Sequence, residues 1–383
     1  MPTFRTLLFW THLTIGVAAG VVILLMCVTG VALTYEKQML EWADRSTVTT
    51  ATFGAPPVPM EALLASAANA AGGATPTGLT LRAHPAAPAT VTFEGGRVLL
   101  IDRVSGQSLG EPSPGLRRFF RTMTTWHRWL ALEGRSRTTG RAVTGAANLG
   151  FLFIVLSGMY LWLPKAITWV QLRQVLWFRS GLQAKARDFN WHNVIGIWSA
   201  IPLALVVAGA VPISYNWAGA LVYRLAGDTP PAPAARGTDG RRAAPAVPAP
   251  GLDGAIAAAT SAVDDWRTMS IRWAADAVPL TIAVDRGYGG QPQHRTTFTV
   301  DRTSAQITRR ESFADQGPGR QWRSWFRFVH TGEYYGLAGQ TIAGAASAGG
   351  AVLVYTGVAL SLRRFAAWRR RRQAPRVASG VAA

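Results

Sequence analysis

Four of the six histidines occupy matched places in the two halves of the chain. His12 and His192 each begin an apolar stretch, in the similar strings His-Leu-Thr-Ile-Gly and His-Asn-Val-Ile-Gly. His127 and His330 each lie in an aromatic, basic segment that precedes a further apolar stretch. An imidazole at the edge of the hydrocarbon layer is unfavourable and indicates a functional site. Interfacial anchoring is the alternative for a single histidine, but two matched pairs favour ligation of a metal centre.

Zinc normally takes four protein ligands, or three and a water, so a pair of histidines falls short of a zinc site. Haem needs only one or two axial ligands, because the porphyrin supplies the other four. Cys27 is the single cysteine, which excludes a Cys-rich cluster, and no Cys-x-x-Cys-His is present for covalent c-type haem. The pattern predicts two non-covalent haems b, one bound by His12 and His192 and the other by His127 and His330.

Haem propionates are anionic, and the segments around His127 and His330 are rich in arginine. Because the guanidinium group suits carboxylates, Arg121, Arg128 and Arg327 are candidate cofactor-binding residues. Capture of an anionic external substrate and contact with lipid phosphates are the alternatives for these cations. The set near the two histidines is Arg117, Arg118, Arg121, Arg128, Arg135, Arg137, Arg141, Arg320, Arg323 and Arg327.

These histidines must be positioned by membrane helices. Hydrophobic residues make up 49% of the chain and charged residues only 15%, which does not suit a purely soluble protein. Four stretches, at 9–35, 143–163, 191–217 and 337–362, are apolar over the roughly 20 residues that a spanning helix needs. The first is too long for a secretory signal and is predicted to be retained. A bundle of these spans puts one matched histidine pair at each membrane face.

The net charge of +19 is concentrated in segments that fall on one side of a four-span chain. Residues 165–188 and the tail after 362 are basic, and Arg5 falls on the same side. By the positive-inside rule that side is the cytoplasm. We therefore expect a multi-pass protein of the bacterial inner membrane with both termini in the cytoplasm. The location of the charge favours membrane lipids, and not nucleic acid, as its partner.

The two long segments between spans are expected in the periplasm. Each begins with an Ala-rich helical stretch, followed by alternating β-branched runs that predict strands. The order span, α+β lobe, His-bearing helix, span then occurs twice, as an internal two-fold repeat. The predicted fold is a mainly α membrane protein, a four-transmembrane-helix bundle with two small periplasmic α+β lobes. The predicted parts are spans at 1–35, 143–164, 189–217 and 337–362, lobes at 36–116 and 252–318, His-bearing helices at 117–142 and 319–336, a basic loop at 165–188, a Pro/Ala linker at 218–251 and a basic tail at 363–383.

An ordered set of motifs runs through the chain. They are Trp126-His127-Arg128-Trp129-Leu130, the string Leu-Ser-Gly-Met-Tyr-Leu-Trp-Leu-Pro at 156–164, Trp191-His192-Asn193-Val194-Ile195-Gly196, His330-Thr331-Gly332 with Gly336, and Tyr355-Thr356-Gly357. The set resembles the PepSY-associated transmembrane family, whose members include iron-regulated ferric-siderophore reductases of the bacterial inner membrane. The resemblance covers residues 1–370. It implies PepSY-like lobes, ligation of haem b by the four histidines, and reduction of a periplasmic Fe(III)-siderophore to Fe(II).

The second lobe departs from the family pattern in two places. Thr303-Ser304-Ala305 stands where the first lobe has Ser105-Gly106. A Gly/Gln-rich insertion at 287–293 is expected to split the hairpin of the second lobe. His84 and His294 lie in the lobes without a matched partner, and we interpret both as surface residues.

The sequence has neither a Gly-x-Gly-x-x-Gly after a strand nor a P-loop. The electron donor is therefore expected to be a cytoplasmic reductase, a reduced flavin or a quinol. A membrane-anchored regulatory or peptidase-inhibitor module without redox activity is the alternative function. A transporter is a third, but the spans carry no Asp, Glu, Lys or Arg at mid-depth, although Pro202 and Pro212 could break the third span.

Overall fold

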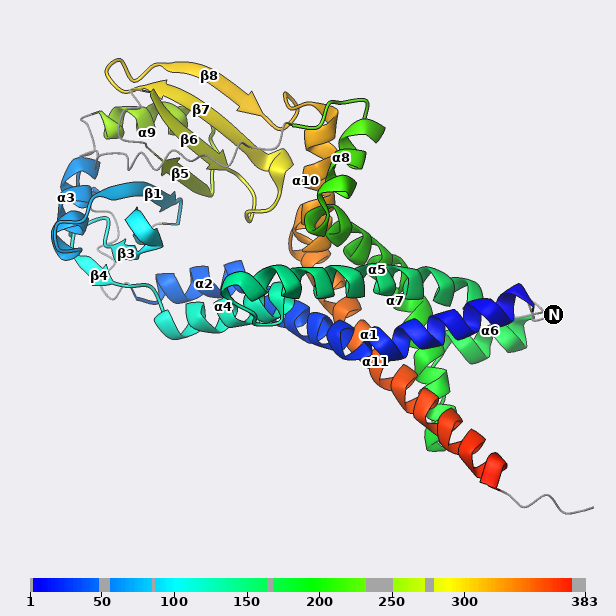
Figure 1. Ribbon diagram of the computed structural model, residues 1–383. Coiled ribbons are helices and arrows are strands. Elements are labelled where there is room, and N and C mark those ends of the chain that lie inside the picture. Colours follow the sequence, from blue (N-terminus) through cyan, green and yellow to red (C-terminus); the bar gives the residue numbers. More distant parts are fainter. Residues whose placement is uncertain are drawn as a thin grey trace, which may run out of the picture. The chain divides into compact units, whose positions relative to one another are not determined.

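The computed structural model describes residues 3–47, 56–84, 87–163, 168–231, 251–272 and 279–373. The chain divides into two compact units (Figure 1). The helical unit comprises Met1–Ala32, Met123–Ser214 and Thr341–Ala383, and the sheet unit comprises Leu33–Thr122 and Tyr215–Gln340.

Four long helices make up the helical unit: α1 (Phe4–Leu33), α5 (Arg137–Trp162), α7 (Ala184–Ser214) and α11 (Gly336–Gln373). Each lies in a segment that is long and apolar enough to cross a membrane. This finding confirms the four predicted spans by length and composition. A shorter helix, α6 (Trp169–Leu176), and a 3-10 turn, η2 (Gly134–Ser136), belong to the same unit.

Two helix boundaries differ from the predicted ones. α7 begins at Ala184, inside the predicted basic loop 165–188, and α6 occupies another part of that loop. α11 does not end at 362 but continues to Gln373 through the arginine-rich segment. Neither segment contains a proline or glycine between these limits and the predicted ones, and alanine, lysine and arginine are good helix formers. Charge patterning did not predict where these two helices begin and end.

Small and branched side chains pack the centre of the helical unit. Cys27 is buried there with Ile23, Phe151 and Leu203, as a small apolar residue. A methyl group at Gly350 would lie only 2.9 Å from the Cys27 sulfur, so a glycine is needed for α11 to approach α1 this closely. Close approach through small residues is the usual way in which membrane helices pack.

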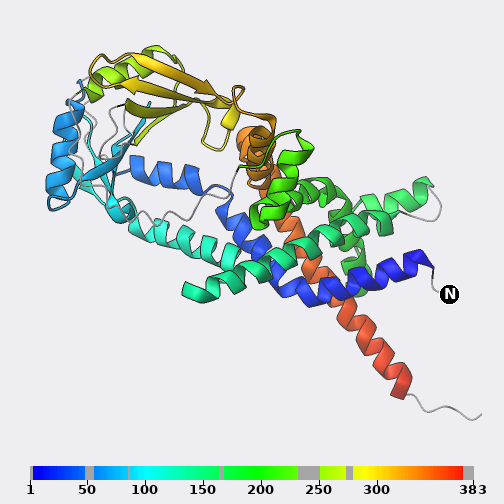
Figure 2. The ribbon, with the colours of Figure 1, turned by 45° about the horizontal axis from the view of Figure 1, so that its top comes forward.

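An eight-stranded sheet in the order β4-β3-β2-β1-β5-β6-β7-β8 organises the sheet unit (Figure 2). Every neighbouring pair of strands is antiparallel. The strands are β1 (Pro76–Arg82), β2 (Ala89–Phe93), β3 (Val98–Ile101), β4 (Ser108–Gly110), β5 (Thr268–Arg272), β6 (Pro279–Asp285), β7 (Arg295–Asp301) and β8 (Ile307–Ser312).

The strands of the two predicted lobes form this single sheet, because β1 pairs with β5. Thr80 lies opposite Ser270 at the centre of the pair, and Leu79 lies opposite Ile271. Pairing satisfies the backbone groups of two strands that would otherwise be exposed sheet edges. The leucine and isoleucine side chains are buried on the face that α3 (Met60–Ala70) and α9 (Leu252–Ser261) cover.

The remaining helices of the sheet unit lie next to the segments expected to cross the membrane. They are α2 (Glu36–Arg45), the first part of α4 (Pro114–Trp129), α8 (Asn216–Leu225) and α10 (Pro318–His330), with the 3-10 turns η1 (Glu94–Gly96), η3 (Pro292–His294) and η4 (Glu333–Tyr335). His127 lies in the last turn of α4, and His330 lies at the end of α10.

Helix α8 occupies the start of the segment that was predicted to be a linker, 218–251. Its buried face, which includes Val222, packs on α10. The ring of Tyr223 lies so close to Gly319 of α10 that a side chain there would collide with it. Packing on α10 therefore stabilises a helix at the start of this segment, although the residues after it have a composition typical of a loop. Residues 232–250 of the predicted linker lie outside the described residues.

Matched turns follow β3 and β7. The carboxylate of Asp102 accepts hydrogen bonds from the N–H groups two and three residues later, at 2.7 and 2.9 Å. Asp301 does the same at 2.9 Å for both. The turn after β7 therefore differs from the turn after β3 only in having Ala305 in place of Gly106. Ala305 adopts a φ of 55°, and Gly106 adopts a φ of 72°.

The insertion at 287–293 forms the loop between β6 and β7, and the register of these strands is unbroken. The expectation that it splits the hairpin was wrong, because the extra residues extend the loop and leave the ladder intact. Lys37 Nζ donates to the Gly289 carbonyl at 3.1 Å and pairs with Glu333 at 2.7 Å. The loop is thus held against α2.

Candidate functional site

His12 lies on α1 with its ring held by α5. Its Nδ1 is 2.8 Å from the hydroxyl of Ser157. That hydroxyl donates its own proton to the Ile154 carbonyl at 3.2 Å, so its oxygen accepts the Nδ1–H. A methyl group at Gly158 would lie 3.4 Å from Cε1 of His12, so the ring lies against the α5 backbone. This tautomer keeps the lone pair on Nε2, the atom that can bind a metal.

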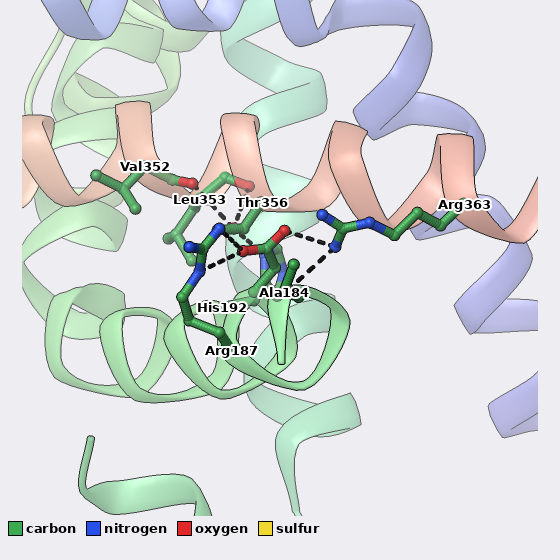
Figure 3. A network of polar contacts seen from close by, with 8 residues as sticks. Ala184, Arg187, His192, Val352, Leu353, Thr356 and Arg363 are labelled. Atoms are coloured by element: carbon green, nitrogen blue, oxygen red, sulfur yellow. Dashed lines mark hydrogen bonds and ion pairs between the residues drawn. The ribbon is translucent and has the colours of Figure 1, made fainter. Parts of the chain in front are cut away.

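His192 on α7 has the same surroundings on α11 (Figure 3). Its Nδ1 lies 2.9 Å from the hydroxyl of Thr356, which donates to the Val352 carbonyl at 2.9 Å. A methyl group at Gly357 would lie 3.4 Å from Cε1 of His192. Thr356 is fully buried, so this hydrogen bond is not shared with solvent.

His127 on α4 is held by α1 in the same way. Its Nδ1 lies 2.9 Å from the hydroxyl of Thr29, and that hydroxyl donates to the Leu25 carbonyl at 2.6 Å. A methyl group at Gly30 would lie 3.5 Å from Cε1 of His127. Three histidines therefore share one arrangement, in which a hydroxyl fixes Nδ1 and a glycine accommodates Cε1.

Sequence reasoning missed the role of these hydroxyls. The available signal was a Ser-Gly or Thr-Gly dipeptide inside a span: Ser157-Gly158, Thr356-Gly357 and Thr29-Gly30. Two of the dipeptides, Ser157-Gly158 and Thr356-Gly357, lie within the family motifs. Hydrogen bonding of a ligand's second ring nitrogen commonly fixes its tautomer and orientation, so the dipeptide has a physical meaning.

The predicted partners His12 and His192 both belong to the helical unit. For the other predicted pair, His127 belongs to the helical unit and His330 to the sheet unit. His330 is partly buried at the end of α10, where Gly332 adopts a φ of 73° and lets the chain turn towards Gly339. Both pairings stay predictions.

A buried carboxylate lies one turn from His192. Asp188 has an exposed fraction of 0% and is held by Arg187 at 2.9 Å and Arg363 at 2.6 Å. Arg363 also donates to the Ala184 carbonyl at 3.3 Å. The two contacts of Arg363 and the His192–Thr356 hydrogen bond link α7 to α11 (Figure 3). They fix the two helices on either side of the imidazole.

The arginines near the histidines divide by their contacts. Arg117 pairs with the fully buried Asp44 at 2.9 Å, so its role is structural. Arg128 and Arg327 are exposed and lie over the aromatic rings of the residues that follow them, at 4.7 and 5.6 Å. Arg121 is also exposed. These three candidates are therefore available to an anion in solution.

Burial lowers the pKa of Arg323.

In the part of the chain that the structure describes, no group of three or more His, Cys, Asp or Glu side chains could hold a metal ion. These described residues therefore provide no set of ligands for a zinc site. The candidate donors are single imidazoles, and a haem needs only one or two axial ligands from the protein.

Comparison with known proteins gives one result on the family. The family model for the PepSY-associated TM region matches residues 9–364. None of the curated proteins matches the chain. The match includes all four spans, the sheet and the four histidines, and leaves out only the ends of the chain. The chain therefore belongs to the family of the PepSY-associated TM region.

Proposed function

We propose that this protein is an inner-membrane, b-type haem protein that passes electrons from the cytoplasm or the quinol pool to a periplasmic acceptor. The acceptor that suits it best is an Fe(III)-siderophore, which is reduced to release Fe(II). One observation carries the proposal: the Nδ1 atoms of His12 and His192 are each hydrogen-bonded to a buried hydroxyl, which directs Nε2 of each ring to a ligand role.

The residues fit haem b better than other centres. His12 and His192 would hold one haem, and His127 and His330 the other. Haem, when bound, supplies an iron that accepts and gives up one electron at a time. The chain contributes the ligands, the hydroxyls that orient them, and the glycines that let each ring lie against a helix.

The exposed arginines would act outside the bundle. Arg121, Arg128 and Arg327 can pair with propionates or attract an anionic chelate. Transfer of one electron converts the bound Fe(III) to Fe(II). Hard oxygen-donor ligands hold Fe(II) more weakly than Fe(III), so reduction releases the metal. No proton transfer or covalent bond to the protein is required.

The orientation in this proposal places both termini in the cytoplasm. α11 continues beyond the predicted span as an exposed basic helix that carries Arg369, Arg370, Arg371 and Arg372. Such a segment is typical of the cytoplasmic side. The sheet unit would then lie in the periplasm, where an extracellular iron chelate arrives.

Pyridine haemochrome spectra of the purified protein test the cofactor. We expect haem b, with two haems per chain, and a low-spin spectrum typical of two histidine ligands. His12→Ala and His192→Ala should each remove the same haem. His84 is exposed and follows strand β1, so His84→Ala should leave both haems in place. Colourless protein from haem-sufficient cells would contradict the proposal and favour the regulatory module.

A further inference from the structure

The indole of Trp162 carries a buried hydrogen-bond donor. Trp162 is the last residue of α5, and its Nε1 atom is buried and has no hydrogen-bond partner among the described residues. The carbonyls of the adjoining residues 160, 161 and 163 already accept hydrogen bonds from the Leu163 N–H or the Arg5 guanidinium. Because a buried donor without an acceptor is unfavourable and uncommon, this N–H points to an acceptor from outside the chain.

Trp162 continues the buried face of α5. Asn148, Phe151 and Val155 are buried on that helix, and the last two belong to the core of the helical unit. Trp162 follows Val155 by seven residues and Gly158 by four, and both spacings return to the same side of a helix. The indole therefore lies on the side of α5 that faces the interior of the helical unit.

The same side of α5 holds the ring of His12. A methyl group at Gly158 would lie 3.4 Å from Cε1 of His12, and Trp162 is about one helical turn further along. Side chains on a helix lean towards its N-terminus, so the indole of Trp162 leans back over the turn of Gly158. The unpaired N–H and the imidazole thus belong to one neighbourhood.

The charge at this end of α5 permits an anionic acceptor. The C-terminal end of a helix has a partial negative charge, which repels anions. The guanidinium of Arg5 offsets it, because it donates to the Leu161 and Leu163 carbonyls at 2.8 and 2.9 Å. A carboxylate is then the acceptor that gains most from the Trp162 N–H, since charge strengthens a hydrogen bond.

We infer that Trp162 is a cofactor-binding residue, whose N–H donates to a propionate carboxylate of the haem proposed at His12. This role of Trp162 rests on the function proposed above. It supplies a propionate partner on the side expected in the cytoplasm. The candidates named above for propionates lie near the other two histidines in the sequence; they are Arg121, Arg128 and Arg327.

The matched position in the second half of the chain does not provide such a donor. Four residues after Gly357 of α11 stands Ser361, as Trp162 stands four residues after Gly158. The hydroxyl of Ser361 already donates to the Gly357 carbonyl at 2.7 Å. Of these two matched positions, the one on α5 therefore has the free donor.

Haem dimethyl ester, in which both propionates are esterified, separates this hydrogen bond from a packing role. The full chain is purified from haem-deficient cells as the His127→Ala variant, which keeps the site proposed at His12 and His192, and is titrated with haem b or with the ester. Trp162→Phe keeps an aromatic ring and removes the N–H. It should weaken binding of haem b by about 10–100-fold, as loss of a hydrogen bond to a charged group does. The uncharged ester accepts a weaker hydrogen bond, so its binding should change by a clearly smaller factor.

Trp198→Phe is the matched control. Trp198 on α7 is 67% exposed, and its N–H already donates to the Leu176 carbonyl at 3.0 Å, so this variant should bind both porphyrins as its parent does. Equal weakening of the two porphyrins by Trp162→Phe, or no weakening of either, would overturn the inference. A parent protein that binds neither porphyrin would instead contradict the proposed function.

Ultraviolet resonance Raman spectroscopy gives a second readout in the parent protein, without a substitution at 162. The band that reports hydrogen bonding of an indole N–H should shift when haem b is added, and should shift less with the dimethyl ester. The shift should be missing from Trp162→Phe and kept in Trp198→Phe. Bound haem b without a shift in the parent protein would mean that the Trp162 N–H does not bind the propionate.

Discussion

Three hydroxyl side chains, those of Thr356, Ser157 and Thr29, perform the same local task. Each donates to a carbonyl of its own helix and accepts from a histidine of another. The first bond occupies the hydroxyl proton, so the second must be an Nδ1–H donation. The neighbouring helix thereby determines which ring nitrogen of each histidine carries the proton.

Thr356→Val should weaken binding of the haem proposed at His192, because valine keeps the volume but cannot accept the Nδ1–H. Loss of such a partner typically costs about 10–100-fold in metal affinity. Haem-to-protein ratio after dialysis and the midpoint potential of each haem are the measurements. Thr356→Ser keeps the hydroxyl and should behave like wild type. An unchanged ratio and potential in Thr356→Val would contradict a positioning role.

Asp301 gives the sheet unit an acid-sensitive turn. Hydrogen bonds from the Ser304 N–H and hydroxyl and from the Thr303 N–H hold the pKa of Asp301 below its ordinary value of 3.8. Because the folded-state pKa is the lower one, the stabilisation is present above the ordinary carboxyl pKa and is lost as pH falls through the folded value. Asp301→Asn keeps an acceptor oxygen and should remove this pH dependence, as thermal unfolding between pH 2 and pH 5 would reveal. An unchanged acid profile in Asp301→Asn would contradict it.

At the scale of elements, the spans were predictable and the sheet was only partly so. Apolar length alone marks the four spans, and alternation marks strands such as β6 and β7. The pairing of β1 with β5 was not predictable, because Leu79 and Ile271 are far apart in sequence and neither strand encodes its partner. Helix α8 was missed because its packing on α10 through Tyr223 depends on the tertiary structure. The hydroxyl partners of the histidines were missed although a Ser-Gly or Thr-Gly dipeptide marks each of them in the sequence; the histidine that each hydroxyl contacts depends on the tertiary structure.

The turn after β7 contains a residue that its conformation does not suit. Ala305 has a φ of 55°, in the left-handed region that glycine adopts readily. Ala305→Gly should stabilise the sheet unit by about 1 kcal/mol, since side chains with a Cβ cost that much in this region. Thermal or denaturant unfolding is the measurement. Ala283→Gly, within strand β6, should instead destabilise, and the same sign for both variants would contradict the explanation.

At the scale of the molecule, arginines tie the ends of the long helices together on the side expected in the cytoplasm. Arg5 donates to the Leu161 and Leu163 carbonyls at 2.8 and 2.9 Å, where α5 ends, and cations are favourable at a helix C-terminus. Arg364 of α11 lies over the Phe9 and Trp10 rings of α1 at 4.9 and 4.8 Å. The basic charge of this side is thus partly structural. It joins α1, the helix of His12, to α5 and α11.

The proposed function predicts a direction of electron flow across the membrane. If His12 and His192 hold the haem nearer the cytoplasm, that haem must be reduced before the outer haem. Electrons from an internal reductant must then pass through the inner haem to reach external iron. Proteoliposomes with an impermeant reductant sealed inside should therefore convert an external Fe(III)-siderophore to Fe(II), trapped by an external ferrous chelator. Protease cleavage of the basic tail reports the fraction of molecules in each orientation.

His12→Ala should stop this transfer, while dithionite added outside still reduces the outer haem. His84→Ala is the matched control, because this exposed histidine belongs to neither predicted pair and its loss should leave the rate unchanged. Electron transfer needs both haems in sequence, so removing the inner one breaks the path although the outer site and its arginines remain. External iron reduction at the wild-type rate in His12→Ala vesicles would mean that the inner pair is not on the path.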